Sequence, residues 1–335
     1  MVFKRAGSRG IGPIDAISNA HRESSKNRHR VQIRHRMREK LVRIREGVES
    51  RATFSRVAEP SYLSLSSICR NHGLKAKPLV FQQFMSKGLM SYENNKYSLT
   101  RAGEDIGGKY YKNENGETWI VWDEDRVRPL VIESKRKLIK ELNLPSLSHL
   151  THITNLSSIL EHGLQCHKNN YKKFDISNKE VNARRDKPEN IHGRKVHDYV
   201  PMYFNPKNSM LYQVQQQYGD NILILSFRNE LMADFPSIFS DQNAANSNAR
   251  FTDKIYELEK FDWEAIYSEK WTHDGVVNKV IKSRMMSECL VYGVVNVSYL
   301  EAIYCATPAA MSKVESICRN QGVIANVFAD RNRFF

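Results

Sequence analysis

The apolar and polar positions that follow residue 147 predict a strand that leads into a helix. His152 and Thr154 are two residues apart, so both side chains project from one face of an extended strand. Asn155 is a suitable N-cap for the helix, and Gly163 is a suitable stop. Between them, apolar residues recur at helical spacing, at Leu156, Ile159 and Leu160. A strand, a polar pair and a helix start in this order are typical of a pocket for a polar small molecule.

A pair of arginines and an aromatic strand follow this predicted pocket. Arg184 and Arg185 are adjacent, and guanidinium groups are suited to phosphate binding. Their spacing does not distinguish the two. The strand that comes next offers a surface for a flat ring through its aromatic residues Tyr199, Tyr203 and Phe204.

Residues 59–128 show the pattern of a small winged-helix-like domain. Helices are expected over 63–71 and 79–87, each ended by a glycine. Asn94 and Asn95 lie between two alternating segments and predict a β-hairpin. This order resembles the winged-helix ends of phage regulatory proteins.

In winged-helix modules the second helix enters the DNA major groove. Here that helix carries Gln82, Gln83 and Lys87, whose side chains could contact base edges or phosphates. Its apolar residues, such as Val80 and Phe84, also suit a surface that docks on a protein. The pattern therefore leaves DNA reading and protein docking as alternatives.

Residues 1–58 are expected to form a basic helical arm, and residues 129–146 a linker helix. In the arm, Lys and Arg recur beside apolar residues at helical spacing. Such a helix follows a phosphate backbone, docks on a partner or packs on the next domain. Pro145 marks the hinge into a domain at 147–335.

Length and charge narrow the possible classes of protein. With 335 residues and a net charge of +14, the chain has room for two domains and suits a polyanionic partner. No stretch approaches a membrane span, and the basic N-terminus lacks the apolar run of a secretory signal. The five cysteines are scattered without a CxxC pair, which favours a reduced, cytoplasmic protein without structural zinc. His149 and His152 have no acidic or cysteine partner nearby, so we assign no metal site.

Four motifs, in order along the chain, resemble the DarT family of toxin ADP-ribosyltransferases, which transfer ADP-ribose from NAD onto bases in DNA. They are HLTHITNLSSILEHGL, the NARRDKP segment, HDYVPMYFNPKNSMLY and SECLV. The resemblance covers roughly residues 147–308. It implies an α+β ADP-ribosyltransferase fold, with two packed sheets and an NAD cleft, in a catalytic domain over 147–335.

The resemblance also implies which residues act. Glu288 corresponds to the carboxylate that stabilises the positive charge of the ribose. We prefer Arg185 to Arg184 as the catalytic arginine, which is carried on a loop that covers NAD. Residues 243–288 correspond to the target-binding loop, which is basic and aromatic here. We assign NAD binding to His152, Ile153, Thr154, Gly163, Arg184, Arg185 and Tyr203.

These observations predict a cytoplasmic mono-ADP-ribosyltransferase that uses NAD as a substrate and modifies a base in single-stranded DNA. Transfer onto RNA is one alternative, because stacking and phosphate contacts suit both nucleic acids. A catalytically inactive DNA-binding regulator is another. The resemblance implies a neutralising antitoxin, either a macrodomain protein that removes ADP-ribose or a partner held by the N-terminal extension, in a toxin–antitoxin or phage-defence system.

Overall fold

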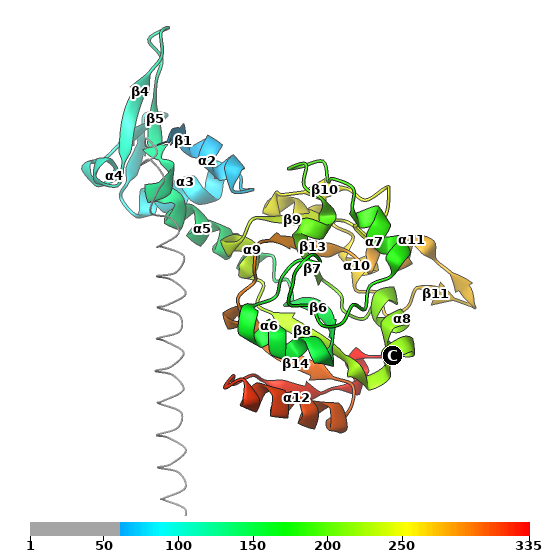
Figure 1. Ribbon diagram of the computed structural model, residues 1–335. Coiled ribbons are helices and arrows are strands. Elements are labelled where there is room, and N and C mark those ends of the chain that lie inside the picture. Colours follow the sequence, from blue (N-terminus) through cyan, green and yellow to red (C-terminus); the bar gives the residue numbers. More distant parts are fainter. Residues whose placement is uncertain (1–60) are drawn as a thin grey trace, which may run out of the picture. The chain divides into compact units, whose positions relative to one another are not determined.

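An eight-stranded sheet forms the centre of the C-terminal part of the chain (Figure 1). The computed structural model describes residues 61–335, so the predicted basic arm lies outside the described residues. The strands lie in the order β10-β9-β13-β7-β6-β8-β14-β15, and every neighbouring pair is antiparallel except β14 and β15. In chain order they are β6 (Leu147–His152), β7 (Tyr199–Tyr203), β8 (Ile222–Phe227), β9 (Ser237–Ser240), β10 (Phe251–Thr252), β13 (Glu288–Tyr292), β14 (Leu300–Cys305) and β15 (Val327–Ala329).

The sheet is divided between β6 and β7. These two strands share a single register pair, Ser148 with Tyr203, whereas β6 pairs with β8 along its whole length. His149 crosses the gap, since its Nδ1 lies 2.8 Å from the carbonyl oxygen of Pro201. The two predicted sheets therefore correspond to two four-stranded halves that meet at one point, and the space between the halves is open to a ligand.

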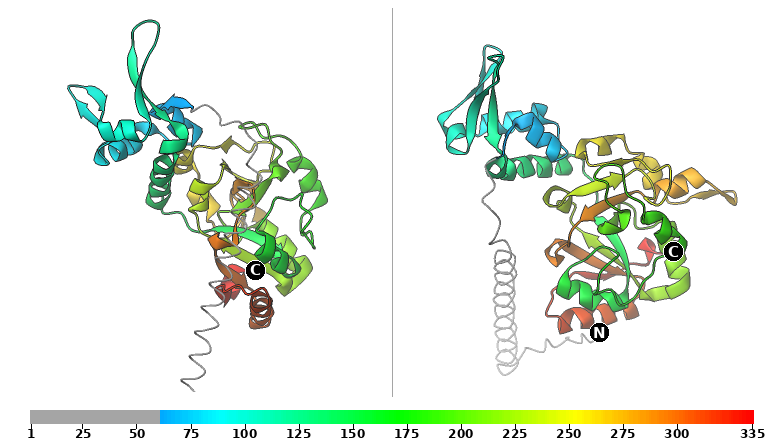
Figure 2. Two further views of the ribbon diagram at one scale, coloured as in Figure 1. Left: turned by 60° about the vertical axis from the view of Figure 1, so that its left-hand side comes forward. Right: turned by 45° about the horizontal axis from the view of Figure 1, so that its top comes forward.

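Helices cover the sheet and carry the loops of the site. They are α6 (Leu156–His162), α7 (Lys179–Arg185), α8 (Ser209–Tyr218), α9 (Leu231–Asp234), α10 (Trp263–Ile266), α11 (Lys279–Arg284) and α12 (Pro308–Asn320). The last of these has Pro308 in its first turn, and the Thr307 hydroxyl accepts from the Ala310 N–H. It packs beside α6 (Figures 1 and 2). A short hairpin, β11 (Thr272–His273) with β12 (Val276–Val277), precedes α11. Among residues 61–335, no helix is both long enough and apolar enough to cross a membrane.

The N-terminal part holds a small helical and sheet module. Its elements are β1 (Tyr62–Ser64), α2 (Leu65–Asn71), α3 (Phe81–Ser86), β2 (Met90–Glu93), β3 (Lys96–Leu99), α4 (Arg101–Asp105), β4 (Gly108–Lys112) and β5 (Thr118–Asp123). The predicted hairpin is present as β2 and β3, and Asn94 and Asn95 both have positive φ, as a tight two-residue turn requires. The module departs from the winged-helix pattern because β1 pairs with β5 of a second hairpin, which gives a three-stranded sheet β1-β5-β4.

Helix α3, for which DNA reading and protein docking are the alternatives, contacts the next helix along the chain. This helix is only six residues long as α3, and the next helix is α5 (Glu124–Glu141). The Ser134 hydroxyl of α5 donates to the side chain of Gln83, and Lys87 Nζ lies 3.3 Å from Glu133 Oε2. Gln82 and Lys87 are exposed and Gln83 is half-buried, and of these three residues only Gln82 has no such contact to α5. This arrangement disfavours α3 as a reader of base edges.

The linker helix begins earlier than expected. As α5 it starts at Glu124, where the Asp123 carboxylate accepts from two backbone N–H groups, and it runs across the predicted boundary at residue 128. Pro129 lies inside this helix, and a proline argues against helix in a sequence because it lacks an N–H. The domain boundaries stay predictions, since 60–335 form a single unit.

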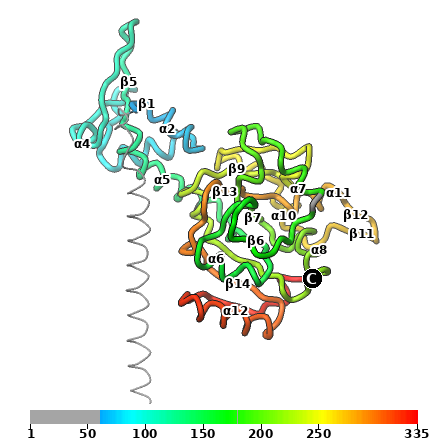
Figure 3. Tube along the Cα trace, in the orientation of Figure 1, coloured from blue at the N-terminus to red at the C-terminus, as the bar shows by residue number. Residues whose placement is uncertain are grey.

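Hydrogen bonds, a cation–π contact and a shared core join the module to the catalytic part. Arg136 of α5 donates to Asp234 from Nε at 3.1 Å and from Nη2 at 2.6 Å. The Gly73 carbonyl accepts from the Ile255 N–H at 3.0 Å. Figure 3 follows the chain from α5 into β6.

We expect Gly73→Ala to destabilise the protein more than Gly88→Ala. Both glycines have positive φ, which costs an alanine about 1–2 kcal/mol. A Cβ on Gly73 would lie 2.1 Å from the Asp253 carbonyl oxygen, whereas one on Gly88 would meet nothing within 4 Å. Overpacking should therefore add about 1–3 kcal/mol at Gly73 alone. Urea denaturation measures both losses, and equal losses would show that the contact between Gly73 and Asp253 is not maintained in solution.

Candidate active site

A cavity opens where the two halves of the sheet part. Its volume is about 300 Å³, at the lower end of the range for ligand sites. Strand β6 contributes His149 and Thr151 to the lining, and β7 contributes Pro201 and Tyr203. Other parts of the wall come from α6, from the segment 163–178 that follows it, from α7 and from α8, with Asn243 and Met286 beside them. The cavity is thus enclosed by elements far apart in the sequence.

A buried ion pair lies at one side of this cavity. Arg185, the last residue of α7, donates from Nη1 and Nη2 to the two carboxylate oxygens of Glu288, each at 2.9 Å. The Glu288 side chain has no exposed surface, and that of Arg185 is 10% exposed and reaches the cavity. The Ala244 N–H also donates to Glu288 Oε1 at 3.1 Å. The carboxylate is therefore fixed in position by three N–H donors.

The surroundings adjust the acidity of the groups beside this pair. Burial on its own would lower the pKa of the Arg185 guanidinium, but the charge of Glu288 and the hydrogen bonds to it raise the pKa above its usual value. Burial raises the pKa of the Tyr203 hydroxyl well above its usual range, and the charge of Glu288 adds to this effect. At neutral pH the guanidinium is therefore charged and the phenol is neutral.

Strand pairing explains why Glu288 is buried. It is the first residue of β13, and it stands opposite Tyr203 of β7 and Ser240 of β9. Its own N–H lies 3.3 Å from the Ser240 hydroxyl. A central strand is hydrogen-bonded on both sides, so the carboxylate points into the protein and needs the charged partner that Arg185 provides.

A second buried carboxylate organises the segment between α7 and β7. Glu189 accepts from the N–H groups of Ile191, His192 and Arg194 at 2.6–3.0 Å and from the Tyr199 hydroxyl at 2.9 Å. Burial favours a higher pKa for Glu189, but these donors hold the pKa below its usual value. The carboxylate stabilises the turn that directly follows Arg185.

Asn155 does not cap α6 as the sequence predicts. Its backbone is already helical, and its side chain instead reaches the segment after α6. Its Oδ1 accepts from the N–H groups of Lys173 and Phe174 at 3.0 and 2.8 Å, and its Nδ2 donates to the Phe174 carbonyl at 2.8 Å. Asn155 is buried, so these bonds fix the wall of the cavity.

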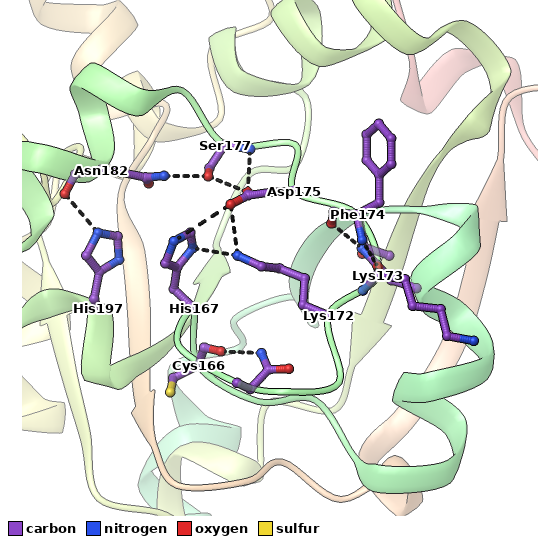
Figure 4. A network of polar contacts seen from close by, with 12 residues as sticks. Cys166, His167, Lys172, Lys173, Phe174, Asp175, Ser177, Asn182 and His197 are labelled. Atoms are coloured by element: carbon purple, nitrogen blue, oxygen red, sulfur yellow. Dashed lines mark hydrogen bonds and ion pairs between the residues drawn. The ribbon is translucent and has the colours of Figure 1, made fainter.

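Two stacked histidines line the cavity near Arg185 (Figure 4). The rings of His167 and His197 have centroids 4.4 Å apart, and His197 Nε2 donates to the Asn182 carbonyl at 2.8 Å. Lys172 Nζ lies 3.3 Å from His167 Nδ1 and 2.9 Å from Asp175. Burial lowers the pKa of both histidines, so both rings are neutral at pH 7. The described residues contain no group of His, Cys, Asp and Glu that could hold a metal ion.

The comparisons with known proteins identify the family. The family described as "ssDNA thymidine ADP-ribosyltransferase, DarT" matches residues 148–335. The chain belongs to the DarT family. It is 32% identical over 156 residues to the DNA ADP-ribosyl transferase of Thermus sp. (strain 2.9), a match that covers 43% of this chain and 73% of the relative. It is 27% identical over 201 residues to the DNA ADP-ribosyl transferase-DNA ADP-ribosyl glycohydrolase fusion protein of Thermosipho africanus, covering 56% of this chain and 49% of that protein.

Solved DarT structures share the fold. The Thermus sp. 2.9 DarT in complex with ADP-ribosylated ssDNA has a TM-score of 0.53 and 27% identity, covering 58% of this chain and 97% of that one. The same protein in complex with NAD+ gives 0.51 and 26%, covering 57% and 98%. These likenesses confirm the predicted α+β ADP-ribosyltransferase fold and the predicted family.

The structure of this DarT family member brings some predicted NAD residues to the cavity and not others. Gly163, Arg185 and Tyr203 line the cavity. His152 and Thr154 are close, with Nδ1 and Oγ1 3.0 Å apart, but Thr154 lies in a 3₁₀ turn (Ile153–Asn155) and not on the strand. The His152, Ile153 and Thr154 segment is outside the lining, although the His152 ring stacks on Phe174, which belongs to it.

The two adjacent arginines point to different places. Arg184 is exposed and borders a second hollow, with Asn243 and Ala245 among its other lining residues. Arg185 is buried against Glu288. Both lie at the end of a helix, which corrects the expectation that the catalytic arginine is carried on a loop. The sequence did not predict the roles of Asn155 and Glu189. Their contacts are largely to backbone groups of other segments, which no sequence pattern marks.

We expect Asn155→Ala to loosen the cavity wall. The change removes the acceptor of the Lys173 and Phe174 N–H groups, so these amides should exchange hydrogen faster. Losing one to two net hydrogen bonds should weaken NAD binding by about tenfold. Ser157→Ala is the matched control, because Ser157 lies two residues further on, in α6, but accepts from Gln321, the residue that follows α12. Unchanged amide exchange and unchanged NAD titration would show that Asn155 does not order this wall.

We also expect the free energy of unfolding to fall as the pH drops below about 6.5, the ordinary pKa of histidine. The folded protein lowers the pKa of His167 and His197, so the unfolded chain binds more protons at acidic pH. The stabilisation is thus present above pH 6.5 and is lost as the pH falls through that value. Denaturation measured between pH 7.5 and 5.5 should show a smaller loss in the variant His167→Gln/His197→Gln. An identical loss in the variant would exclude these two rings as the cause.

Proposed function

We propose that this chain transfers ADP-ribose from NAD to a thymidine base in single-stranded DNA. As a member of the DarT family it is an NAD-dependent ADP-ribosyltransferase. The observation that carries the proposal is the bidentate pair of Arg185 with Glu288, buried beside a cavity between the halves of the sheet. The family description names single-stranded DNA and thymidine, which favours DNA over RNA as the target.

The cavity suits the dinucleotide substrate. Its lining combines cationic groups, Arg185 and Lys172, with the aromatic rings of Tyr171 and Phe174. Guanidinium and ammonium groups bind phosphates, and aromatic rings stack on flat heterocycles. Amide and hydroxyl groups such as Asn182 and Ser158 can orient the ribose and the carboxamide.

Glu288 is the residue that stabilises the reacting ribose. As the bond from the ribose to nicotinamide breaks, its electron pair leaves with nicotinamide, and positive charge develops on the sugar. A carboxylate fixed close to the sugar stabilises that charge without having to reorganise. The Ala244 N–H and the guanidinium of Arg185 hold Glu288 in place before the reaction begins.

Arg185 positions the carboxylate and binds phosphate. A guanidinium stays protonated in proteins, so it does not itself accept the proton that the base releases on forming its new bond to the ribose. We assign this proton to the Glu288 carboxylate, whose negative charge is no longer needed once the bond has formed. Phosphate groups in the cavity would compete for Arg185 and free a Glu288 oxygen for this step.

Such an enzyme damages the DNA of the cell that makes it, so the proposal includes a neutralising partner. The Thermosipho africanus relative joins a transferase and a DNA ADP-ribosyl glycohydrolase in one protein. This supports a separate glycohydrolase of the macrodomain type as the antitoxin of the present chain. The intact pair of Arg185 and Glu288 argues against an inactive regulator, because a buried ion pair is costly to keep without a use.

Replacing Glu288 tests the proposal. Glu288→Gln keeps the shape of the side chain and removes its charge, so transfer from labelled NAD to a thymidine-containing single strand should fall at least about a hundredfold, while NAD still binds. The matched control is Glu230→Gln at an exposed position outside the cavity and outside residues 243–288, which should leave transfer unchanged. Near-normal labelling by the Glu288 variant would refute the assignment, and labelling of RNA or protein in place of DNA by the unaltered chain would refute the substrate.

A further inference from the structure

One face of the three-stranded sheet in the N-terminal module carries exposed aromatic rings. Alternate residues of a strand share a face, and so do residues directly opposite each other. Trp119 of β5 lies opposite Tyr111 of β4, and two positions along, Val121 lies opposite Lys109. Two positions further, Asp123 lies opposite Tyr62 of β1. Tyr62, Lys109, Tyr111 and Trp119 therefore lie on one face, which we call the aromatic face.

The opposite face of this sheet is the one that packs into the core. Trp122 is 1% exposed, and Leu63 and Ile120 pack against the same core. On the aromatic face, Tyr62, Tyr111 and Trp119 are 36%, 49% and 40% exposed. Tyr110, on the opposite face, is 49% exposed as well, so both faces expose rings toward the outer end of the β4–β5 hairpin. Three large rings on one face nevertheless exceed what core packing requires.

One lysine lies between the aromatic rings of this face. The rings of Tyr111 and Trp119 have centroids 4.9 Å apart, and Lys109 Nζ lies 3.3 Å from the centroid of the Tyr62 ring. Asp123, which lies opposite Tyr62, is four residues from Trp119 on β5, which corresponds to about 13 Å along a strand. This length accommodates about four stacked nucleotides at ~3.4 Å each.

One cationic group and one ion pair lie at this face. Lys109 contacts the Tyr62 ring, and Arg126 pairs with Asp123, which lies on the same face, at 3.5 Å. The chain reaches Tyr62 directly after residues 1–60, whose sequence holds fifteen Lys and Arg against six Asp and Glu. A cationic segment followed by an aromatic sheet face provides the two elements of single-strand binding, which are phosphate contacts and base stacking.

We propose that the aromatic face of β1-β5-β4 binds single-stranded DNA by stacking bases on Tyr62, Tyr111 and Trp119. The proposal rests on the proposed function, because it supposes that the DNA strand bound by this face is the one that the catalytic part modifies. It assigns DNA binding to this sheet and not to α3, for which DNA reading was one of two alternatives and whose residues Gln83 and Lys87 contact α5.

The chemistry of the face favours a nucleic acid over a protein partner. Exposed Tyr and Trp also occur in protein interfaces, so the rings alone do not decide the partner. Single-stranded DNA is preferred because the catalytic part of this chain acts on it, which places such a strand at the protein. Base stacking needs flat rings that project from the surface, with cations close by for the phosphates. The β4–β5 hairpin extends beyond the rest of the module, so a flexible strand can reach its rings (Figures 1 and 2).

The test uses the full chain carrying Glu288→Gln, without NAD, and a labelled 20-nucleotide oligo(dT). Fluorescence anisotropy should show that Tyr111→Ala/Trp119→Ala weakens binding of this single strand at least about fivefold, with a smaller effect on a duplex of the same length. The matched control, Tyr92→Ala, removes an exposed ring from β2 outside this sheet and should change the affinity less than about twofold. Ultraviolet crosslinking with bromodeoxyuridine in the strand should label peptides that contain Tyr111 or Trp119.

Three results would overturn the proposal. One is unchanged single-strand affinity with no crosslink on the aromatic face, and another is an equal loss for single strand and duplex, which would indicate charge without stacking. The third is loss of a co-purifying protein with no change in DNA binding. If the alanine variant does not fold by circular dichroism, Tyr111→Leu/Trp119→Leu keeps apolar bulk but not flat rings and takes its place. Because this assay needs neither NAD nor Glu288, its outcome is independent of whether the unaltered chain transfers ADP-ribose.

Discussion

The buried ion pair of Arg185 with Glu288 is the constraint on which the rest of the site depends. Removing either partner would leave an uncompensated charge in the protein interior, at a cost of about 3–5 kcal/mol. The fold therefore has to hold both residues accurately. Strands β7 and β9 fix Glu288 from its two sides, and the Glu189 carboxylate fixes the turn that follows Arg185. The division of the sheet beside this pair leaves room for a substrate within reach of the guanidinium.

The sequence predicted the elements of the site better than their contacts. Glu288 and the arginine pair were assigned because they stand in motifs, and apolar periodicity predicted α6. Asn155 has the residue type of a helix cap, but its amide bonds the distant backbone of Lys173 and Phe174 instead. Local patterns contain no information on contacts between segments that are far apart in the chain. For the same reason, adjacency could not separate Arg184 from Arg185, whereas the two side chains point to different hollows.

The N-terminal module shows a similar limit. The hairpin at Asn94 and Asn95 was predictable because positive φ at two successive residues favours asparagine. The pairing of β1 with β5 was not, since it joins strands more than fifty residues apart. That pairing creates the aromatic face, whereas α3, for which the sequence left DNA reading and protein docking as alternatives, contacts α5. The catalytic part acts on single-stranded DNA, and the aromatic face presents rings to bases. Both parts of the chain would then bind the same DNA strand.

A double-mutant cycle on the ion pair tests the central claim, which is that Arg185 and Glu288 act as one unit in transfer. The rates of ADP-ribose transfer to a thymidine-containing single strand are measured for Arg185→Met, for Glu288→Gln and for the two changes together. Residues that act as a unit give strongly non-additive effects, so the double variant should lose little more activity than the worse single variant. If the two losses multiply, the residues contribute independently, and the ion pair is not the centre of the reaction.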